Sequence, residues 1–172
     1  NIEKKINSKR VDIKNFKKVK KVIKEFEPDF IFHLAAQSIV KKSYENTIET
    51  WKTNLLGTIN ILESLKENHK KTVTIIITSD KCYKNFEIDR AYSENDILGG
   101  DDPYGASKSA AEIAINSYVK SFFNSKKNNN VIVSTRAGNV IGGGDWTENR
   151  LIPDCVKPWK KNKIVKIRNL KS

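Results

Sequence analysis

The run V-T-I-I-I at residues 73–77 constrains the fold of this chain more than any other stretch. A nearly continuous β-branched run is typical of a parallel strand that is buried on both faces of a sheet. Further apolar runs and stretches with helical spacing predict the order helix 15–26, strand 30–36, helix 47–68, strand 73–77, helix from 103 and strand 131–135. This alternation predicts an α/β fold with a doubly wound parallel sheet, in one domain or most of one.

Smaller elements are predicted around this frame. Residues 11–13 are expected to form a strand end followed by a turn, and 41–44 a loop. A short helix is expected to begin at Leu151, and the alternation at 164–167 predicts a further strand. Gly57 lies inside the long helix, where glycine costs about 1 kcal/mol relative to alanine, so we expect close packing against a neighbour there.

Polar residues follow the 73–77 strand. T-S-D-K at 78–81 leaves the sheet at its carboxyl end, the edge at which open α/β sheets bind ligands. After a polar loop, Asp101, Asp102 and Pro103 signal the start of a helix that opens with Y-G-A-S-K. The sequence therefore places a hydroxyl, a carboxylate and amines near one phenol, that of Tyr104.

Tyr104 and Lys108 are four residues apart, so they share one helix face. An ammonium beside a phenol stabilises the phenolate, and Tyr104 is therefore expected to act as a base. A Tyr and a Lys at this spacing also occur on many amphipathic helices that carry no chemistry. The serine at the end of a buried strand upstream, Ser79, favours the catalytic interpretation.

The formal charge of +12 raises the question of a nucleic-acid partner. The lysines are spread along the chain, so we interpret them as a lysine-rich surface and expect no nucleic acid. No apolar run approaches the roughly 20 residues of a membrane span and no signal segment opens the chain, which predicts a cytoplasmic protein without a membrane partner. Cys82 and Cys155 lack metal-ligand spacing, so we expect reduced thiols and no metal.

Five motifs together resemble the extended short-chain dehydrogenase/reductase superfamily, and more narrowly its nucleotide-sugar 4,6-dehydratases. They are F-H-L-A-A-Q-S at 32–38, T-N-L-L-G-T at 53–58, T-S-D-K at 78–81, D-P-Y-G-A-S-K at 102–108 and R-A-G-N-V-I-G-G-G-D-W at 136–146. S-D-K and the later R-L-I-P-D-C resemble the CDP-glucose 4,6-dehydratases, whereas the dTDP-glucose enzymes carry T-D-E. The resemblance covers nearly the whole chain and implies a Rossmann-like fold.

The resemblance implies NAD-dependent dehydration of CDP-glucose to CDP-4-keto-6-deoxyglucose, a step in deoxysugar and O-antigen synthesis. Tyr104 would take the C4 hydroxyl proton while NAD+ takes the C4 hydride, Ser79 would hydrogen-bond the C4 oxygen, and Lys108 would hold the nicotinamide ribose. Asp80 would protonate the leaving C6 hydroxyl before the hydride returns to C6. Lys81 stands where the dTDP enzymes have glutamate as the C5 base, so it could serve only as a neutral amine or through a water.

The resemblance also assigns binding residues. Asn54 matches the helix asparagine of the superfamily's proton relay, and the expected cofactor contacts, besides Tyr104 and Lys108, are Asp12, Leu34, Ala35, Ala36 and Gln37. The expected nucleotide-sugar contacts lie in a segment, 139–172, that would lead into the nucleotide-sugar-binding part: Asn139, Arg150, Leu151, Ile152 and Pro153. Superfamily members are often homodimers through two helices that here carry Leu62, Ile113, Ile115 and Tyr118, although these residues could instead be core.

Other interpretations stay open. The chain lacks the strand and G-x-x-G-x-x-G turn that the family uses for the cofactor's pyrophosphate, and it stops where the family continues into its sugar-nucleotide domain. The resemblance thus implies roughly the middle half of an enzyme, which alone is expected to bind NAD poorly. The alternatives are another nucleotide-sugar epimerase or dehydratase on the same scaffold, and a non-catalytic relic or basic binding module. His33 could be a packed strand residue, and Arg136 a structural ion-pair partner.

Overall fold

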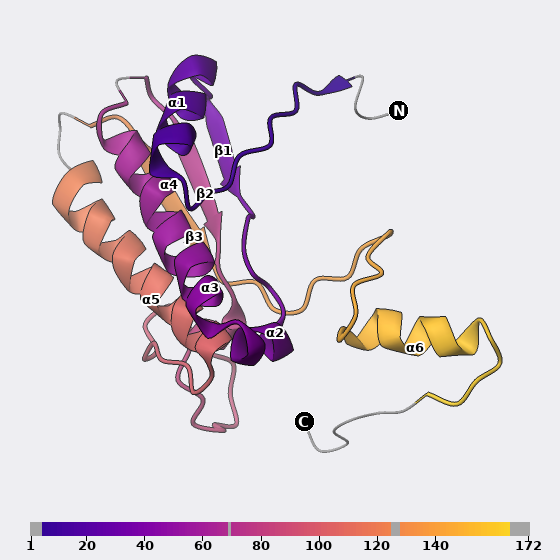
Figure 1. Cartoon of the computed structure of the whole chain (residues 1–172). Helices are drawn as coiled ribbons and strands as arrows, with labels where there is room; N and C mark the ends of the chain where they lie inside the picture. Colours follow the sequence, from indigo (N-terminus) through magenta and orange to yellow (C-terminus); the bar gives the residue numbers. More distant parts are fainter. Residues whose placement is uncertain (1–4, 69, 125–127, 166–172) are drawn as a thin grey trace. The chain divides into compact units, whose positions relative to one another are not determined.

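The computed structural model describes residues 5–68, 70–124 and 128–165, and the chain divides into two compact units, Asn1–Gly138 and Asn139–Ser172. In the first unit helices and strands alternate, as predicted (Figure 1). Its elements are α1 (Phe16–Phe26), β1 (Phe30–His33), α2 (Val40–Glu45), α3 (Thr47–Trp51), the π-helical turn η2 (Lys52–Leu56), α4 (Gly57–Lys66), β2 (Val73–Ile77), the 3-10 turn η3 (Asp80–Cys82), α5 (Pro103–Tyr118), the π-helical turn η4 (Val119–Phe123) and β3 (Val131–Thr135).

The three strands form one parallel sheet in the order β1-β2-β3. Phe30 pairs with Val73, and Val73 in turn pairs with Val131, so all three strands begin at one edge and end at the other. Parallel neighbours need a crossover connection, and α4 and α5 provide the helices of the two crossovers. The predicted parallel, Rossmann-like α/β arrangement is confirmed.

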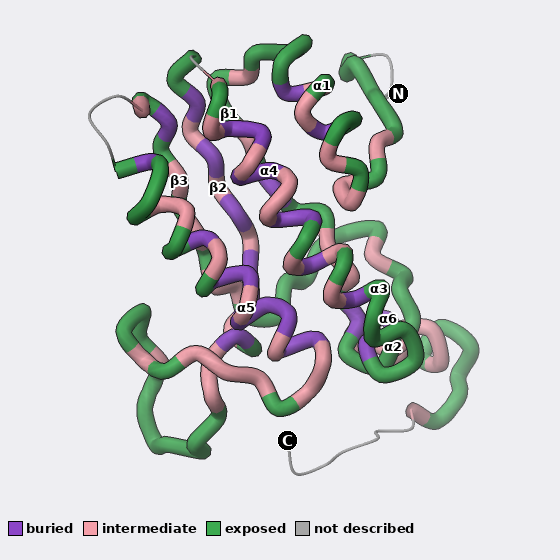
Figure 2. Tube along the Cα trace, turned by 60° about the vertical axis from the view of Figure 1, so that its left-hand side comes forward, coloured by how far each residue is buried: buried purple, intermediate pink, exposed green. Residues whose placement is uncertain are grey.

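The core lies between the sheet and the helices that cover one of its faces. Leu62 and Leu65 of α4 are fully buried, and they pack with Ile76 of β2 and Ile115 of α5. Val19 and Ile23 bring α1 into the same cluster. Figure 2 shows this buried layer along α4, β2 and α5.

The opposite face of the sheet carries apolar side chains that the described residues do not cover. Side chains alternate between the two faces of a strand. Phe30 and Phe32 of β1 are 63% and 60% exposed, and Val131 and Val133 of β3 are each 43% exposed. Burial of the strands on both faces was predicted, and it holds here for only one face, because α1, α4 and α5 all pack on the other set of side chains.

The long predicted helix 47–68 is α3, η2 and α4 in succession. Its axis is interrupted by the π-helical turn, a distortion that occurs mostly at functional sites. A Cβ atom added to Gly57, directly after this turn, would lie 2.5 Å from Cδ1 of Ile13. The predicted close packing at Gly57 is therefore confirmed.

Three local predictions were wrong. The predicted loop at 41–44 lies within α2, where Ser43 is buried and its hydroxyl donates to the Val40 carbonyl. Residues 11–12 form no strand, although the turn that follows at 13–14 is present. Ile164 is 93% exposed and neither it nor Val165 belongs to a strand, while the rest of that predicted strand lies outside the described residues.

The second unit contains α6 (Leu151–Trp159), which begins at the predicted residue. Two lysines hold the segment around Trp146 to this helix. Lys157 Nζ donates to the Trp146 carbonyl oxygen at 2.8 Å, and Lys160 Nζ lies 4.9 Å from the centre of the Trp146 ring.

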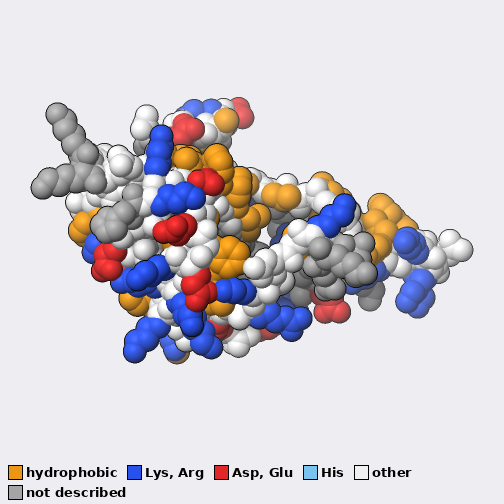
Figure 3. Space-filling model, turned by 90° about the horizontal axis from the view of Figure 1, so that it is seen from above, with side chains coloured by type: hydrophobic (Ala, Val, Ile, Leu, Met, Phe, Trp, Pro, Cys, Tyr) orange, Lys and Arg blue, Asp and Glu red, His pale blue; other side chains and the backbone are white. Residues whose placement is uncertain are grey.

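Positive charge does not collect into one patch on the face that Figure 3 shows, where Lys and Arg lie among Asp and Glu. Several lysines pair with acids, including Lys9 with Glu25, Lys20 with Glu67 and Lys70 with Asp29. In the described ranges no helix is both long and apolar enough to cross a membrane.

The four residues considered for a dimer interface separate in the structure. Leu62 and Ile115 belong to the core, as predicted by the alternative that these residues are core rather than interface. Ile113, by contrast, is 59% exposed on α5. Tyr118 is partly buried, and its hydroxyl donates to Glu63 Oε2 at 2.9 Å.

Candidate active site

The S-D-K segment leaves β2 along the backbone of β3. The Thr78 amide donates to the Thr135 carbonyl at 2.8 Å, and the Asp80 amide donates to the Ala137 carbonyl at 3.0 Å. Ser79 is buried and caps η3, since its Oγ accepts from the Lys81 amide at 3.2 Å and donates to Asp80 Oδ1 at 3.0 Å. These bonds extend the parallel pairing past the strands and give the segment one defined conformation.

Asp80 and Lys81 point out of this turn toward solvent. Lys81 Nζ lies 3.5 Å from Asp80 Oδ2, and the side chains are 57% exposed for Lys81 and 44% exposed for Asp80. A solvent-exposed ion pair contributes little to stability. The pair therefore adds little to the stability of the fold, and both groups stay accessible to a ligand.

The helix that carries Tyr104 begins as the sequence predicts. Asp102 is the N-cap of α5, and its Oδ1 accepts from the amides of Tyr104 and Gly105 at 2.9 and 3.1 Å. Tyr104 and Lys108 both lie on the buried face of this helix. Lys108 Nζ donates to the Ile77 carbonyl at 3.4 Å, and burial lowers the pKa of this ammonium, with Cys82 and Glu112 opposing the shift.

Two glycines allow close packing around the start of α5, next to the S-D-K turn. A Cβ atom on Gly105 would lie 2.9 Å from the Lys81 carbonyl oxygen, and one on Gly100 would lie 2.2 Å from the Ala106 nitrogen. Real Cβ atoms do not approach other atoms this closely. The absence of a side chain at Gly105 therefore lets the Tyr104 helix lie directly against the S-D-K segment, while Gly100 lets the preceding loop lie against the first turn of α5.

Asn54 joins the end of β1 to α5. It lies in the π-helical turn η2 and is buried. Its Oδ1 accepts from the Gln37 amide at 2.9 Å, while its Nδ2 donates to the Gln37 carbonyl at 3.1 Å and to Ser107 Oγ at 2.9 Å. These contacts tie Asn54 to the neighbouring helix α5 at Ser107, which lies three residues after Tyr104.

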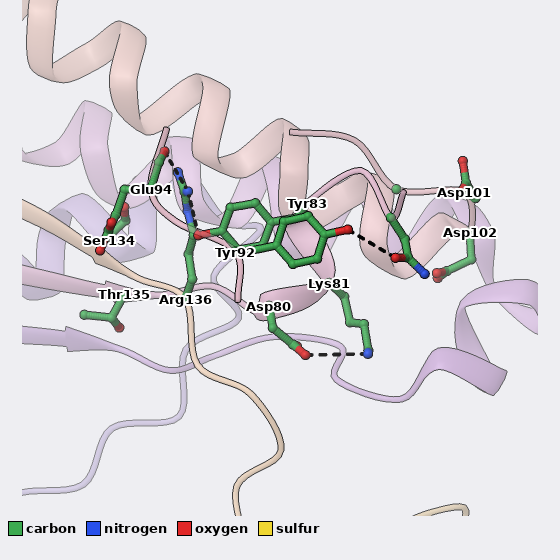
Figure 4. Close-up of a pocket in the computed structure, with 12 residues that line it drawn as sticks. Asp80, Lys81, Tyr83, Tyr92, Glu94, Asp101, Asp102, Ser134, Thr135 and Arg136 are labelled. Carbon is green, nitrogen blue, oxygen red and sulfur yellow. Dashed lines mark hydrogen bonds and ion pairs between the residues drawn. The ribbon is translucent and has the colours of Figure 1, made fainter. Parts of the chain in front are cut away.

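A pocket of about 930 Å³ opens beside the turn (Figure 4). Of the predicted catalytic residues, Asp80 and Lys81 line it, whereas Asn54, Ser79, Tyr104 and Lys108 do not. Figure 4 shows Tyr83 and Tyr92 lying against each other in the middle of the pocket, with ring centres 5.0 Å apart. The remaining lining comes from the loop before α5 and the end of β3: Asn85, Glu94, Gly100, Asp101, Asp102, Ser134, Thr135 and Arg136.

Glu112 is a buried acid at this edge that sequence analysis missed. Its carboxylate accepts from Thr78 Oγ1 at 2.5 Å, from Ser134 Oγ at 3.1 Å and from Arg136 Nη2 at 2.9 Å. The signal was present in the sequence, because Glu112 follows Tyr104 and Lys108 by one further turn of the same helix face. The structural ion-pair interpretation of Arg136 is confirmed.

Two titratable groups near this edge are neutral at pH 7 for the same reason. His33 is buried at the end of β1, where its Nε2 lies 3.2 Å from Thr58 Oγ1, and burial together with the charge of Lys108 lowers the pKa of its imidazole to about 4. The predicted packing of His33 is thereby confirmed. Burial, with Glu112 nearby, raises the pKa of the Cys82 thiol to about 11. Both cysteines are free thiols, as predicted.

The predicted cofactor residues lie in two places. Leu34 and Ala35 are exposed directly after β1, and Ala36 and Gln37 are partly buried beside them. Asp12 is exposed in the turn before α1, and a hydrogen bond from the Lys14 amide lowers the pKa of its carboxyl. The structure brings Gln37 to Asn54, but the described contacts of Asp12 include none of the other site residues.

The predicted nucleotide-sugar residues all belong to the second unit. Asn139 is exposed, and Arg150 precedes α6 with its Nε 3.5 Å from Asp145 Oδ2. Leu151 and Ile152 in the first turn are 66% and 44% exposed, and Pro153 is buried. Their role in binding stays a prediction.

Among the described residues, no group of three or more His, Cys, Asp or Glu could hold a metal ion.

A Rossmann-like unit with a Tyr-Lys helix beside a Ser-Asp-Lys turn at the sheet's carboxyl edge defines a domain of the extended short-chain dehydrogenase/reductase class. Within this class, the family described as GDP-mannose 4,6 dehydratase matches residues 1–169. The chain belongs to this family.

Several known proteins resemble the chain. A CDP-glucose 4,6-dehydratase of Salmonella typhimurium is 46% identical over 161 residues, which are 92% of this chain and 45% of that protein. A dTDP-D-glucose 4,6-dehydratase of Dictyostelium discoideum is 32% identical over 145 residues, 78% of this chain and 32% of that protein. The crystal structure of Thermus thermophilus UDP-glucose 4-epimerase in complex with NAD superposes with a TM-score of 0.69 at 29% identity, over 81% of this chain and 43% of that one. The chain thus spans less than half the length of each.

Proposed function

We propose that the protein is a nucleotide-sugar 4,6-dehydratase that converts CDP-glucose to CDP-4-keto-6-deoxyglucose with NAD. The observation that carries the proposal is the packing of the Tyr104 helix against the S-D-K turn, with Gly105 placed directly on the Lys81 carbonyl. This juxtaposition would offer the phenol of Tyr104 for one proton transfer and the carboxyl group of Asp80 for another. The 46% identity to the Salmonella CDP-glucose 4,6-dehydratase supports the choice of substrate.

The residues present fit a nicotinamide cofactor. Lys108 is buried with a single long hydrogen bond, 3.4 Å to the Ile77 carbonyl, among the described residues, so its ammonium retains donors for ribose hydroxyls. Leu34 and Ala35 leave apolar surface open after β1. The related Thermus epimerase was solved with NAD. When bound, NAD+ would accept a hydride from C4 of the sugar and return it to C6.

The first proton transfer would belong to Tyr104. A base is most effective when it lies within hydrogen-bond reach of the proton it takes. Ser79, held in place by the Lys81 amide, would hydrogen-bond the C4 oxygen as it becomes a ketone. Asn54, which is bound to Gln37 and Ser107, would hold in place the relay that leads the proton away from Tyr104.

The second half of the reaction would belong to the turn itself. Asp80 lines the pocket and would protonate the C6 hydroxyl as it leaves. Lys81 is more than half exposed and stays beside Asp80, which favours removal of the C5 proton through a water rather than by direct contact. Arg150 and Asn139 of the second unit would hold the diphosphate, since a guanidinium can pair with two phosphate oxygens. The exposed Ile113 on α5 is consistent with a homodimer.

The test compares Asp80→Asn with a matched control in the protein expressed from its complete reading frame. Asp89→Asn removes an exposed carboxylate from the loop that connects η3 to α5, one that does not line the pocket. With CDP-glucose and NAD+, the wild type and Asp89→Asn should release a product that has lost one water. Asp80→Asn should still oxidise C4, seen as NADH absorbance, while water loss falls by about 10² to 10⁴-fold.

Other outcomes identify the alternatives. A product with the mass of the substrate would indicate an epimerase on the same scaffold, like the Thermus relative. Salt-sensitive binding to generic nucleic acid, with no response to NAD+, would indicate a basic binding module. Equal loss of both steps in Asp80→Asn would contradict the assigned role of Asp80.

A further inference from the structure

The Glu112 carboxylate is the meeting point of two strands and a helix. It lies on α5 and is 4% exposed. Its donors come from the residue after β2, Thr78, from β3 through Ser134, and from the residue after β3, Arg136. Hydrogen bonds to a buried carboxylate are short and strong. If the carboxylate is removed, each buried donor is left without a partner, which lowers the free energy of unfolding.

Arg136 carries this connection to the far side of the catalytic turn. Its Nη1 donates to the Tyr83 hydroxyl at 3.0 Å and to the Glu94 carbonyl at 3.1 Å, and its guanidinium carbon lies 4.9 Å from the centre of the Tyr83 ring. Burial opposes the charge of Arg136, but its bonds to Glu112 and Tyr83 outweigh that effect and raise the pKa of the guanidinium. Arg136 is therefore a permanent cation with partners on both sides.

The two tethers bracket the catalytic segment. Thr78 directly precedes Ser79, and Tyr83 directly follows Cys82, the last residue of η3. Thr78 binds Glu112 itself, and Tyr83 binds it through Arg136. Both ends of the Ser79–Cys82 segment are thus attached to the helix that carries Tyr104 and Lys108, at a point two turns beyond Tyr104.

We propose that Glu112 is a positioning residue that sets the S-D-K turn against the Tyr104 helix, with Arg136 as its relay. The proposal rests on the proposed dehydratase function. Glu112 does not touch the reacting atoms, because its carboxylate is buried and accepts three hydrogen bonds from protein groups. Ser79 shares the tethered turn, but the base of the first step, Tyr104, is held by its own helix and cap. The acid of the second step, Asp80, depends on the tethered turn alone. Loss of Glu112 therefore acts on the Asp80 step more than on the Tyr104 step.

The experiment measures both steps in single turnovers of the full-length protein with CDP-glucose and NAD+. Glu112→Gln keeps the size of the side chain and loses its charge. A misplacement of about 1 Å costs on the order of 10²-fold in rate, so water loss should slow by about that factor, with NADH accumulating before it and KM changed little. Thr78→Val removes one tether without burying an unpaired charge, and it should change the ratio of the two steps in the same direction by a smaller factor.

Tyr118→Phe is the control, because it removes the Tyr118–Glu63 hydrogen bond at the other end of α5. It should lower the melting temperature without changing the ratio of the two steps. If Glu112→Gln and Thr78→Val slow both steps equally, as a loss of stability would, the positioning role is wrong.

A second readout needs no turnover. Amide hydrogen exchange should become faster at residues 79–84 in Glu112→Gln, while the 113–118 end of α5 stays as protected as in the wild type. Unchanged exchange at 79–84 would overturn the proposal even if the protein proved to catalyse another reaction. A wild type that fails to dehydrate CDP-glucose but shows this exchange pattern would contradict only the proposed function.

Discussion

The two edges of the sheet are closed by different chemistry. At the amino edge, before β2 and β3, the buried ties are neutral: Asn130 Nδ2 donates to the carbonyls of Leu65 and Asn68, and its Oδ1 accepts from the Thr72 amide. Thr72 Oγ1 donates to the Pro28 carbonyl. These bonds join the chain before β1, the end of α4 and the starts of β2 and β3 without any charge.

At the carboxyl edge the same task falls to charged and titratable groups. Glu112 and Arg136 tie two strand ends to α5, with Lys108 and His33 buried nearby. Burying ions is costly, and at the other edge of the same sheet the buried partners are neutral while the ion pair of Lys70 with Asp29 stays exposed. The difference teaches that the charges at the carboxyl edge serve something other than closure, and perturbed ionisable groups concentrate where proteins carry out chemistry.

Of the variants that compare the two edges, Arg136→Met should lower the free energy of unfolding most. It leaves the buried Glu112 carboxylate without its cation, which costs about 3–5 kcal/mol in the free energy of unfolding. Urea unfolding of the full-length protein measures this value. Arg90→Met provides the control, since Arg90 is 54% exposed in its pair with Asp96, and it should change the unfolding free energy far less. Equal losses in the two variants would remove the distinction between the edges.

Acid should destabilise the carboxyl edge through His33. The pKa of His33 is about 4 in the folded protein, below its ordinary value of 6.5, so the unfolded chain binds the proton more readily between these values. Stability from this group is complete above pH 6.5 and falls as the pH drops toward 4, by roughly 3 kcal/mol in all. Unfolding free energies at pH 7.5, 5.5 and 4.5 should show a smaller acid loss in His33→Gln. Identical pH profiles would show that His33 titrates normally.

Asn130→Ala tests the neutral edge. It leaves the Leu65 and Asn68 carbonyls and the Thr72 amide without this partner, which should cost about 2 kcal/mol in unfolding free energy. The loss should be independent of pH and salt, because no charge is involved. Asn116→Ala, an exposed asparagine on α5, should be nearly neutral. A strongly salt-dependent loss in Asn130→Ala would contradict the neutral character of this edge.

Tyr118→Phe should have the smallest effect. It removes one partly buried hydrogen bond to Glu63 and keeps the ring against Phe122, so the expected loss is about 1 kcal/mol in unfolding free energy. Tyr44→Phe, at a tyrosine 63% exposed on α2, is the comparison and should change little. A loss as large as that of Arg136→Met would mean that the whole of α5, rather than its end near the turn, is sensitive to lost polar contacts.

Local patterns in the sequence were sufficient for the elements that position the site. The strand at Val73–Ile77, the Asp102 cap and the shared face of Tyr104 and Lys108 all appear as predicted, because each depends on residues within a few positions of one another. The same reasoning failed at 41–44, where the polar residues suggested a loop. There Ser43 is buried and bonded to its own helix, so tertiary packing outweighed composition.

The sequence by itself determined the order of helices and strands and the edge at which polar residues gather, since periodicity and capping act over one or two turns. Only the tertiary structure decided which residues meet at that edge. Glu112 finds Thr78 at a separation of 34 residues and Arg136 at 24, distances over which no local pattern operates. The physical reason is burial: a carboxylate that leaves water must find donors wherever the fold places them, and that choice belongs to the packed chain as a whole.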